Sequence, residues 1–265
     1  MTAGTLVYVA SLAKQVTAAC AALLVLDGVL DVDRPLAEFV PALPSWSTAV
    51  RIRHLIHHTG GLPRDGTQLA PDRTTEGVLG AGIALEASPG TRFSYSNVGY
   101  VCLASAIEGA AGEPIAGFAR RRIFEPLGMA DTVFWDGPAP RPPGAAPLDP
   151  VHPAPLSLGD GGVWSTGEDL LRWCAGLDDD RLGVTRMVQT PGRLDDGTEL
   201  GYAWGTGVRR QRELTVYWHS GGYADLRTML LRVPERGLDL VILAPGDRSE
   251  RRTALADALL DNLLT

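Results

Sequence analysis

The sequence contains a single lysine, Lys14, among its 24 Lys and Arg residues. Arginine cannot be deprotonated in a protein, whereas a lysine that is removed from water can lose its proton and act as a base. Arginine therefore serves wherever this chain needs only a positive charge. We interpret the one remaining lysine as a residue kept for the chemistry of its amine.

Cysteines and long apolar runs are also scarce. Cys20, Cys102 and Cys174 are odd in number and far apart, which argues against a disulfide framework or a zinc site and favours small buried side chains. The longest apolar run, residues 18–26, is too short to span a bilayer, and the N-terminus has no leader of the signal-peptide type. We expect no membrane segment and a cytoplasmic protein as given, or a secreted or periplasmic one if the true N-terminus is missing.

An excess of positive charge is absent as well. The net charge is -7 and the arginines are scattered, which argues against a nucleic-acid partner. His54, His57 and His58 invite a metal interpretation, but no carboxylate has the spacing of a metalloprotease helix. We therefore expect neither a metal nor a cofactor in this chain of 265 residues, which is long enough for one large domain or two interleaved ones.

Ser11 and Lys14 form the first candidate motif. Ser11 is predicted to be the N-cap of a buried helix, because a run of Ala and Leu follows and Gly28 ends it. The three-residue spacing would put Lys14 on the same helical face, near the positive end of the helix dipole. A nucleophile and its base would result; the alternative is a surface lysine near a capping serine.

The rest of the pattern predicts an α+β fold, with helices first and an antiparallel meander last. Helices are expected at Val98–Ala111, Ile115–Leu127 and Arg251–Leu264, and a further helix follows the turn Gly159–Asp169 and ends at Leu177. Strands are expected at Tyr202–Val208, Leu214–His219, Leu226–Val233 and Leu238–Ala244.

Two further motifs lie between and within these elements. Tyr95 and Asn97 are predicted on a loop just before a helix. His219, Ser220, Gly221 and Gly222 are predicted at the end of a strand, where glycines let a substrate carbonyl approach the backbone. A backbone N–H there could form half of an oxyanion hole, with the Ser11 N–H as the other half.

In this order the three motifs resemble the signature of the serine β-lactamase and penicillin-binding-protein superfamily, in the variants similar to class C β-lactamases, D-alanyl-D-alanine carboxypeptidases, esterases and D-aminopeptidases. The likeness runs from about Gly4 to the C-terminus. Further family landmarks are Leu26–Leu30, His58–Leu62, Pro89–Asn97 and Gly161–Thr166.

The resemblance implies an antiparallel sheet flanked by helices, a mostly helical region inserted in the chain, and an active site in the cleft between them. We divide the chain accordingly into residues 1–30, the helical region 31–195, and 196–265, which packs with 1–30 as one α/β unit.

The same resemblance implies residue roles. Ser11 is acylated and Lys14 and Tyr95 share proton transfer. Asn97 holds the substrate amide, and His219 lines the pocket with Ser220, Gly221 and Gly222. The backbone N–H groups of Ser11 and Gly222 form the oxyanion hole.

Two departures from the family pattern matter. The helix and two strands that usually precede the nucleophile are missing, so either the start site is wrongly assigned, or a homo-oligomer covers an exposed sheet edge, or this is a reduced member. His219 stands where many β-lactamases have lysine. We therefore expect hydrolysis of a small ester or amide, of esterase or D-amino-acid-peptidase type. The alternatives are a β-lactamase, an acyltransferase, or a non-catalytic scaffold or ligand-binding relative.

Overall fold

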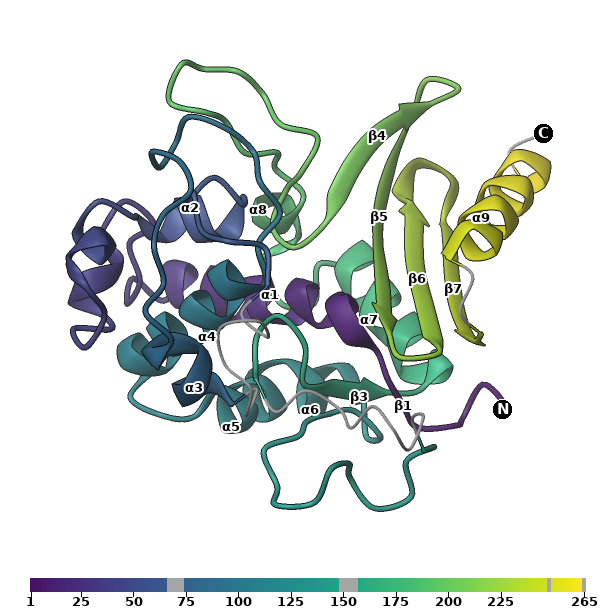
Figure 1. The fold of residues 1–265 in the computed structure, drawn as a ribbon. Coiled ribbons are helices and arrows are strands. Elements are labelled where there is room, and N and C mark those ends of the chain that lie inside the picture. Colours follow the sequence, from purple (N-terminus) through teal and green to yellow (C-terminus); the bar gives the residue numbers. More distant parts are fainter. Residues whose placement is uncertain (66–73, 148–156, 247–248, 264–265) are drawn as a thin grey trace.

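A computed structural model describes residues 1–65, 74–147, 157–246 and 249–263. Its sheet has four antiparallel strands in sequence order, as Figure 1 shows. The strands are β4 (Gly207–Gln211), β5 (Leu214–Tyr223), β6 (Leu226–Val233) and β7 (Leu238–Pro245). The predicted α+β class with an antiparallel sheet is confirmed.

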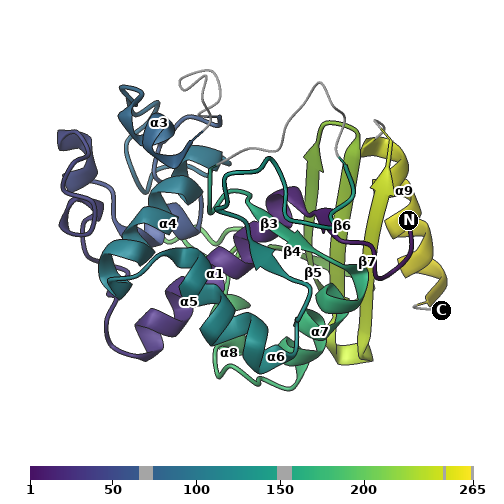
Figure 2. The ribbon, with the colours of Figure 1, turned by 90° about the horizontal axis from the view of Figure 1, so that it is seen from below.

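Helices cover both faces of this sheet, as Figures 1 and 2 together show. On one side lies α9 (Ser249–Leu263), whose buried Leu260 packs with Val216 and Leu231 of the strands. On the other side lie α7 (Gly167–Asp178) and α1 (Ala13–Leu26). The sheet is therefore the middle layer of three, because both of its faces carry apolar side chains.

Helix α1 runs through the core, and every residue from Ala13 to Leu24 is buried. A helix that is buried on all sides needs small apolar residues all round, which explains its Ala-rich sequence. It contacts α4 (Asn97–Ala111) and α5 (Ile115–Ala119). It ends where predicted, because Gly28 follows in the left-handed conformation with φ of 72°.

The helical region consists otherwise of short pieces. These are α2 (Ile52–Ile56), α3 (Thr75–Gly80), a π-helical turn (Arg120–Phe124), α6 (Glu125–Leu127) and α8 (Thr185–Val188). The helix predicted at Ile115–Leu127 is thus observed as α5, the π turn and α6 in succession. None of the described helices is long and apolar enough to cross a membrane. The division of the chain into three parts stays a prediction.

A second, small sheet leads into α1. It has the order β1-β3-β2, formed by β1 (Val7–Tyr8), β3 (Val163–Ser165) and β2 (Val133–Phe134). Because β1 ends three residues before Ser11, this pairing fixes the direction from which the chain enters the site.

The prediction that Ser11 caps α1 is wrong. Ser11 lies inside a 3₁₀ turn, η1 (Ala10–Leu12), and the N-cap of α1 is Leu12, which makes no side-chain cap hydrogen bond. The chain turns sharply between β1 and α1, with Ala10 at φ of 50°. The turn displaces Ser11 from the cap position.

Three other boundaries differ from prediction. The strand predicted at Tyr202–Val208 is observed as β4, which begins only at Gly207 and leaves Tyr202 in the preceding loop. Strand β5 continues to Tyr223, so the His219–Gly222 motif lies within a strand and not at its end. Asn97 is the first residue of α4, capped by the Ser96 hydroxyl, which accepts from Gly99 N at 2.9 Å. Leu264, the predicted end of the last helix, lies outside the described residues.

Candidate active site

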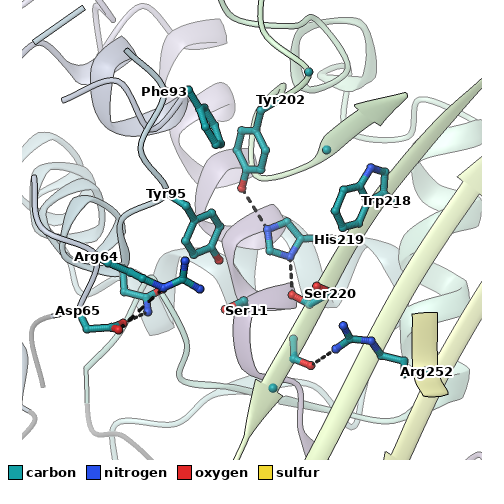
Figure 3. Close-up of a pocket in the computed structure, with 15 residues that line it drawn as sticks. Ser11, Arg64, Asp65, Phe93, Tyr95, Tyr202, Trp218, His219, Ser220 and Arg252 are labelled. Atoms are coloured by element: carbon teal, nitrogen blue, oxygen red, sulfur yellow. Dashed lines mark hydrogen bonds and ion pairs between the residues drawn. The ribbon is translucent and has the colours of Figure 1, made fainter. Parts of the chain in front are cut away.

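The three motifs meet at one cleft of about 700 Å³ between the sheet and the helical region. Figure 3 shows its walls, with Tyr95, Arg64 and Asp65 on one side and the residues of β5 on the other. The lining residues include every predicted site residue except the buried Lys14: Ser11, Tyr95, Asn97, His219, Ser220, Gly221 and Gly222.

The backbone before Ser11 is held from two sides. Val9 N donates to Val163 O at 3.0 Å, and the buried Thr228 hydroxyl donates to Val9 O at 3.0 Å. Ala10 then adopts a φ of 50°, a conformation that costs an L-residue on the order of 1 kcal/mol or more. These fixed contacts compensate for the strain and leave Ser11 half-exposed on the cleft wall.

Gly221 allows β5 to approach this segment closely. A Cβ at position 221 would lie 2.7 Å from Val9 O and 2.3 Å from Thr228 Oγ1. Any side chain would collide with the backbone that carries Ser11, so glycine is required there for packing. The sequence had suggested a different reason for this glycine, the approach of a substrate carbonyl.

Lys14 is completely buried beneath Ser11. Its Nζ lies 3.3 Å from Ser11 Oγ, 2.8 Å from Asn97 Oδ1 and 2.8 Å from the backbone oxygen of Asp160. A charged amine would donate to all three atoms. A neutral amine would donate to the Asn97 and Asp160 oxygens, which can only accept, and present its lone pair to the Ser11 hydroxyl. The geometry thus suits both protonation states.

The Asp160 contact comes from the glycine-rich landmark that begins near Gly161. Thr17 Oγ1 of α1 donates to Gly159 O at 2.8 Å, which fixes this turn against the nucleophile helix. The Asp160 carboxylate itself accepts from Ser157 Oγ at 3.1 Å. Burial raises the pKa of this carboxyl, and the nearby Lys14 charge partly opposes that rise. Sequence reasoning missed Asp160, because a backbone oxygen leaves no signal in a side-chain pattern.

Tyr95 lies above Lys14, whose Nζ is 5.0 Å from the centre of the phenol ring. The ring also packs on His58, with centroids 4.3 Å apart. In Figure 3 its hydroxyl points toward Ser11. Asn97 completes this group, since its Nδ2 donates to Asp65 Oδ1 at 2.6 Å while its oxygen accepts from Lys14.

Three charged residues of the cleft were not predicted. Arg64 and Asp65 follow the His58–Leu62 landmark, and the Arg64 guanidinium lies 5.5 Å from the centre of the Tyr95 ring. Arg252 reaches the cleft from α9, and its Nη1 donates to Gly221 O at 2.8 Å. Arg252 lies within a predicted helix, where nothing local distinguishes it from the other arginines.

His219 is buried on the β5 wall. Its Nδ1 lies 2.9 Å from Ser220 O, and its Nε2 lies 3.1 Å from the Tyr202 hydroxyl. Burial, with the Lys14 charge as a smaller cause, lowers the pKa of His219 to about 3. The imidazole is therefore neutral at physiological pH, and this wall carries no positive charge at position 219.

The other three described histidines do not converge. His54 Nδ1 accepts from Arg51 N at 3.1 Å, and His57 packs edge-on against Trp204 with centroids 6.1 Å apart. His58 instead is buried behind the cleft wall, where it packs on Tyr95 and hydrogen-bonds Tyr202. Within the described ranges no group of three His, Cys, Asp or Glu side chains could hold a metal ion.

Comparisons with known proteins identify the family of the chain and similar folds. The family model described as Beta-lactamase matches residues 1–264. The D-alanyl-D-alanine-carboxypeptidase/endopeptidase AmpH of Escherichia coli (strain K12) is 25% identical, over 96% of this chain and 74% of its own length. The D-aminopeptidase of Gluconobacter oxydans (strain 621H) is 25% identical over 91% of this chain, which spans only 50% of that protein. The crystal structure of the D-amino acid amidase from Ochrobactrum anthropi SV3, complexed with D-phenylalanine, has a TM-score of 0.82 at 25% identity and covers 99% of this chain and 94% of that one.

Proposed function

The chain belongs to the beta-lactamase family and is a serine hydrolase of that type, and we propose that it hydrolyses a small ester or amide through an acyl-enzyme on Ser11. The observation that carries the proposal is the 3.3 Å contact between Lys14 Nζ and Ser11 Oγ, beneath a cleft open to a ligand. This distance lets the amine accept the hydroxyl proton as the oxygen attacks.

In the proposed reaction, Ser11 Oγ attacks the carbonyl carbon while its proton passes to the lone pair of a neutral Lys14 amine or of a Tyr95 phenolate. The backbone N–H groups of Ser11 and Gly222 stabilise the oxyanion. Collapse breaks the bond to the alcohol or amine, which leaves with a proton returned by the same groups. A water molecule then attacks the acyl-enzyme, gives up its proton along the same route and releases the acid, which regenerates Ser11.

The proposed substrate class rests on the neutral side chain at one position of the cleft, His219, although Arg64 and Arg252 also line it. A neutral His219 offers no fixed cation to a β-lactam carboxylate, so we infer that short esters or amides of D-amino acids are preferred. The names of a D-aminopeptidase and a D-amino acid amidase among the similar proteins support the D-amino-acid part of this proposal.

A fluorophosphonate probe tests the nucleophile. We expect intact-protein mass spectrometry to find one adduct on the folded protein and none on Ser11→Ala. Ser45→Ala, at an exposed serine that does not line the cleft, is the control and is expected to retain the adduct. A folded protein without any adduct would favour the non-catalytic scaffold, and an adduct retained by Ser11→Ala would assign the chemistry to another residue.

Product analysis separates the remaining alternatives. With an added alcohol or amine acceptor, a hydrolase is expected to release mainly the free acid. Mainly transferred product would make this chain an acyltransferase. Faster turnover of nitrocefin than of esters would make it a β-lactamase.

We also propose a homo-oligomer that covers the outer edge of β7. In the described part of the chain this strand, Leu238–Pro245, pairs only with β6, and an open strand edge favours association. Light scattering after size-exclusion chromatography is expected to give a mass above that of one chain. A monomer at all concentrations would contradict this proposal.

A further inference from the structure

Four hydrogen bonds join the two walls of the cleft in one line. Ser96 N lies 3.1 Å from His58 Nδ1, and His58 Nε2 lies 3.2 Å from the Tyr202 hydroxyl. That hydroxyl lies 3.1 Å from His219 Nε2, and His219 Nδ1 lies 2.9 Å from Ser220 O. Figure 3 shows the last two links, with Tyr202 above His219. His58, Tyr202 and His219 are all buried.

The two ends of this line determine where every proton lies. The backbone N–H of Ser96 can only donate, so His58 Nδ1 is the acceptor and the neutral ring carries its proton on Nε2. The backbone oxygen of Ser220 can only accept, so His219 Nδ1 carries the proton and its Nε2 is bare. The Tyr202 hydroxyl therefore accepts from His58 and donates to His219. Its further neighbour is the Tyr100 hydroxyl, which donates to Ile56 O at 2.9 Å.

We propose that Tyr202 is a positioning residue that holds His219 as a neutral imidazole with its proton on Nδ1, and that His58 fixes the direction in which Tyr202 donates. If His219 were protonated, its Nε2–H would face the Tyr202 hydroxyl, whose proton would have to turn toward the neighbouring Tyr100 hydroxyl. The hydrogen bond that Tyr202 donates to the neutral ring would then be lost, which disfavours the charged form. The line thus resists protonation at both histidines.

The charged and titratable groups around His219 act in the same direction. Lys14 of α1 and Arg252 of α9 both disfavour a second positive charge at His219. Tyr95, on the loop before α4, faces the His219 ring at a centroid distance of 6.1 Å, and Tyr202 faces it at 6.0 Å. Burial lowers the pKa of His58 as well, so both rings are neutral. No carboxylate is among the described groups that affect the pKa of His219.

A consequence for specificity rests on the proposed function. With His219 held neutral, β5 presents no charge at this position, and an acyl group without a carboxylate is accepted at any pH. If the line were broken, His219 could gain a proton in acid, and substrates with a carboxylate would then bind better.

The arrangement of the protons can be measured without turnover. ¹⁵N NMR of the histidine rings separates protonated from bare nitrogens and neutral from charged rings. In the unmodified protein at about pH 7 we expect His219 to be protonated only on Nδ1 and His58 only on Nε2. Either ring in the opposite tautomer, or a charged His219, would overturn the proposal. The positions of the histidine protons do not depend on whether Ser11 reacts. The proposed role of Tyr202 and the proposed hydrolase function can therefore fail separately.

Tyr202→Phe removes the central hydroxyl and keeps the ring. We expect the Nε2 resonance of His219 to move and the pKa of His219 to rise. The preference for a neutral ester over a carboxylate-bearing one should begin to fall at a pH roughly 1 higher than in the unmodified protein and stay unchanged near pH 8, because one hydrogen bond is lost while burial and Lys14 remain.

Tyr217→Phe is the matched control, since it also removes a phenolic hydroxyl, but from a residue of β5 that does not line the cleft. It should leave the His219 resonances and the pH dependence of the preference as they are. A Tyr202→Phe protein with the His219 spectrum and substrate preference of the unmodified protein would contradict the positioning role. If that variant does not fold, the tautomers of the unmodified protein still decide the matter.

Discussion

The side-chain oxygen of Asn97 lies 2.8 Å from Lys14 Nζ and thereby joins two motifs that are 83 residues apart in the sequence. The other end of the same amide donates to Asp65. One N–H of Asn97 then remains for a substrate, while its oxygen serves to orient the amine. Asn97 thus has a structural partner in the free protein besides the substrate contact that we predict for it.

Lys14→Arg should abolish acylation of Ser11. Arginine keeps the charge but cannot become neutral and accept a proton, and loss of general-base catalysis typically lowers rates about 10²-fold to 10⁴-fold. The measurement is the rate of fluorophosphonate labelling. Because Lys14 is completely buried, Lys14→Met, which is shorter than arginine, provides a second variant without a base. Labelling at the original rate in either folded variant would make Lys14 structural.

Tyr95→Phe should lower ester turnover about 10²-fold to 10⁴-fold, because the ring remains and only the proton carrier is lost. Its melting temperature should hardly change, since the half-exposed phenol keeps its contact with His58. Turnover and thermal melting of the same sample separate the two roles. Full activity with a lowered melting temperature would make Tyr95 a packing residue and leave Lys14 as the sole base.

Gly221→Ala should destabilise the protein by about 1–3 kcal/mol and displace Ser11, because the added carbon meets Val9 O and Thr228 Oγ1. Gly222→Ala is the stability control, since its Cβ would lie 3.4 Å from the flexible Arg227 side chain. Denaturant unfolding of both variants gives the comparison. Equal stability of the two would mean that the contact between β5 and the segment before Ser11 is loose.

Stability should fall in mild acid. The pKa values of His54 and His57 are lowered to about 4 and that of His219 to about 3, in each case mainly by burial, and that of His58 is also lowered. The unfolded chain binds these protons near pH 6.5 and the folded one only at lower pH.

The stability contributed by the neutral rings is therefore complete above about pH 6.5 and is lost as the pH falls from there toward 4 and below, by up to about 1.4 kcal/mol per pH unit for each histidine. Unfolding free energies between about pH 8 and pH 5 test this expectation. Because buried carboxyls such as Asp160 and Asp239 have raised pKa values and oppose this slope, the ring contribution is measured as the slope lost in His57→Gln. An unchanged slope in that variant would show that the His57 ring is not held neutral.

Short p-nitrophenyl esters should be turned over faster than nitrocefin, because no fixed charge stands at position 219 to hold a β-lactam carboxylate. His219→Lys should shift the ratio of the two rates toward nitrocefin by about tenfold or more, the scale of one charge contact in a partly buried site. Steady-state kinetics with both substrates measures the ratio. Faster turnover of nitrocefin by the unmodified protein would contradict the inferred substrate preference.

Local sequence was sufficient for much of this molecule. The Ala-rich run predicted α1 and Gly28 its end, and β-type composition predicted β6 and β7 within a residue. These features depend on the periodicity and conformational preferences of neighbouring residues, which a sequence states directly. The order of the three motifs, with one lysine in the first, was enough to indicate the family and seven of the residues that line the cleft, but not Arg64, Asp65 or Arg252.

Only the tertiary structure decided how those residues work together. The sequence placed Ser11 at a helix cap, but strands from distant parts of the chain hold Val9 and force the turn at Ala10. It gave no sign that a backbone oxygen at Asp160 meets Lys14, or that Tyr202 connects His58 to His219. Such contacts join residues far apart in the chain, and a hydrogen bond to the backbone or between two buried rings leaves no periodic pattern. The protonation of the site follows from this packing, because burial and the direction of each hydrogen bond, rather than residue type, determine which groups are charged.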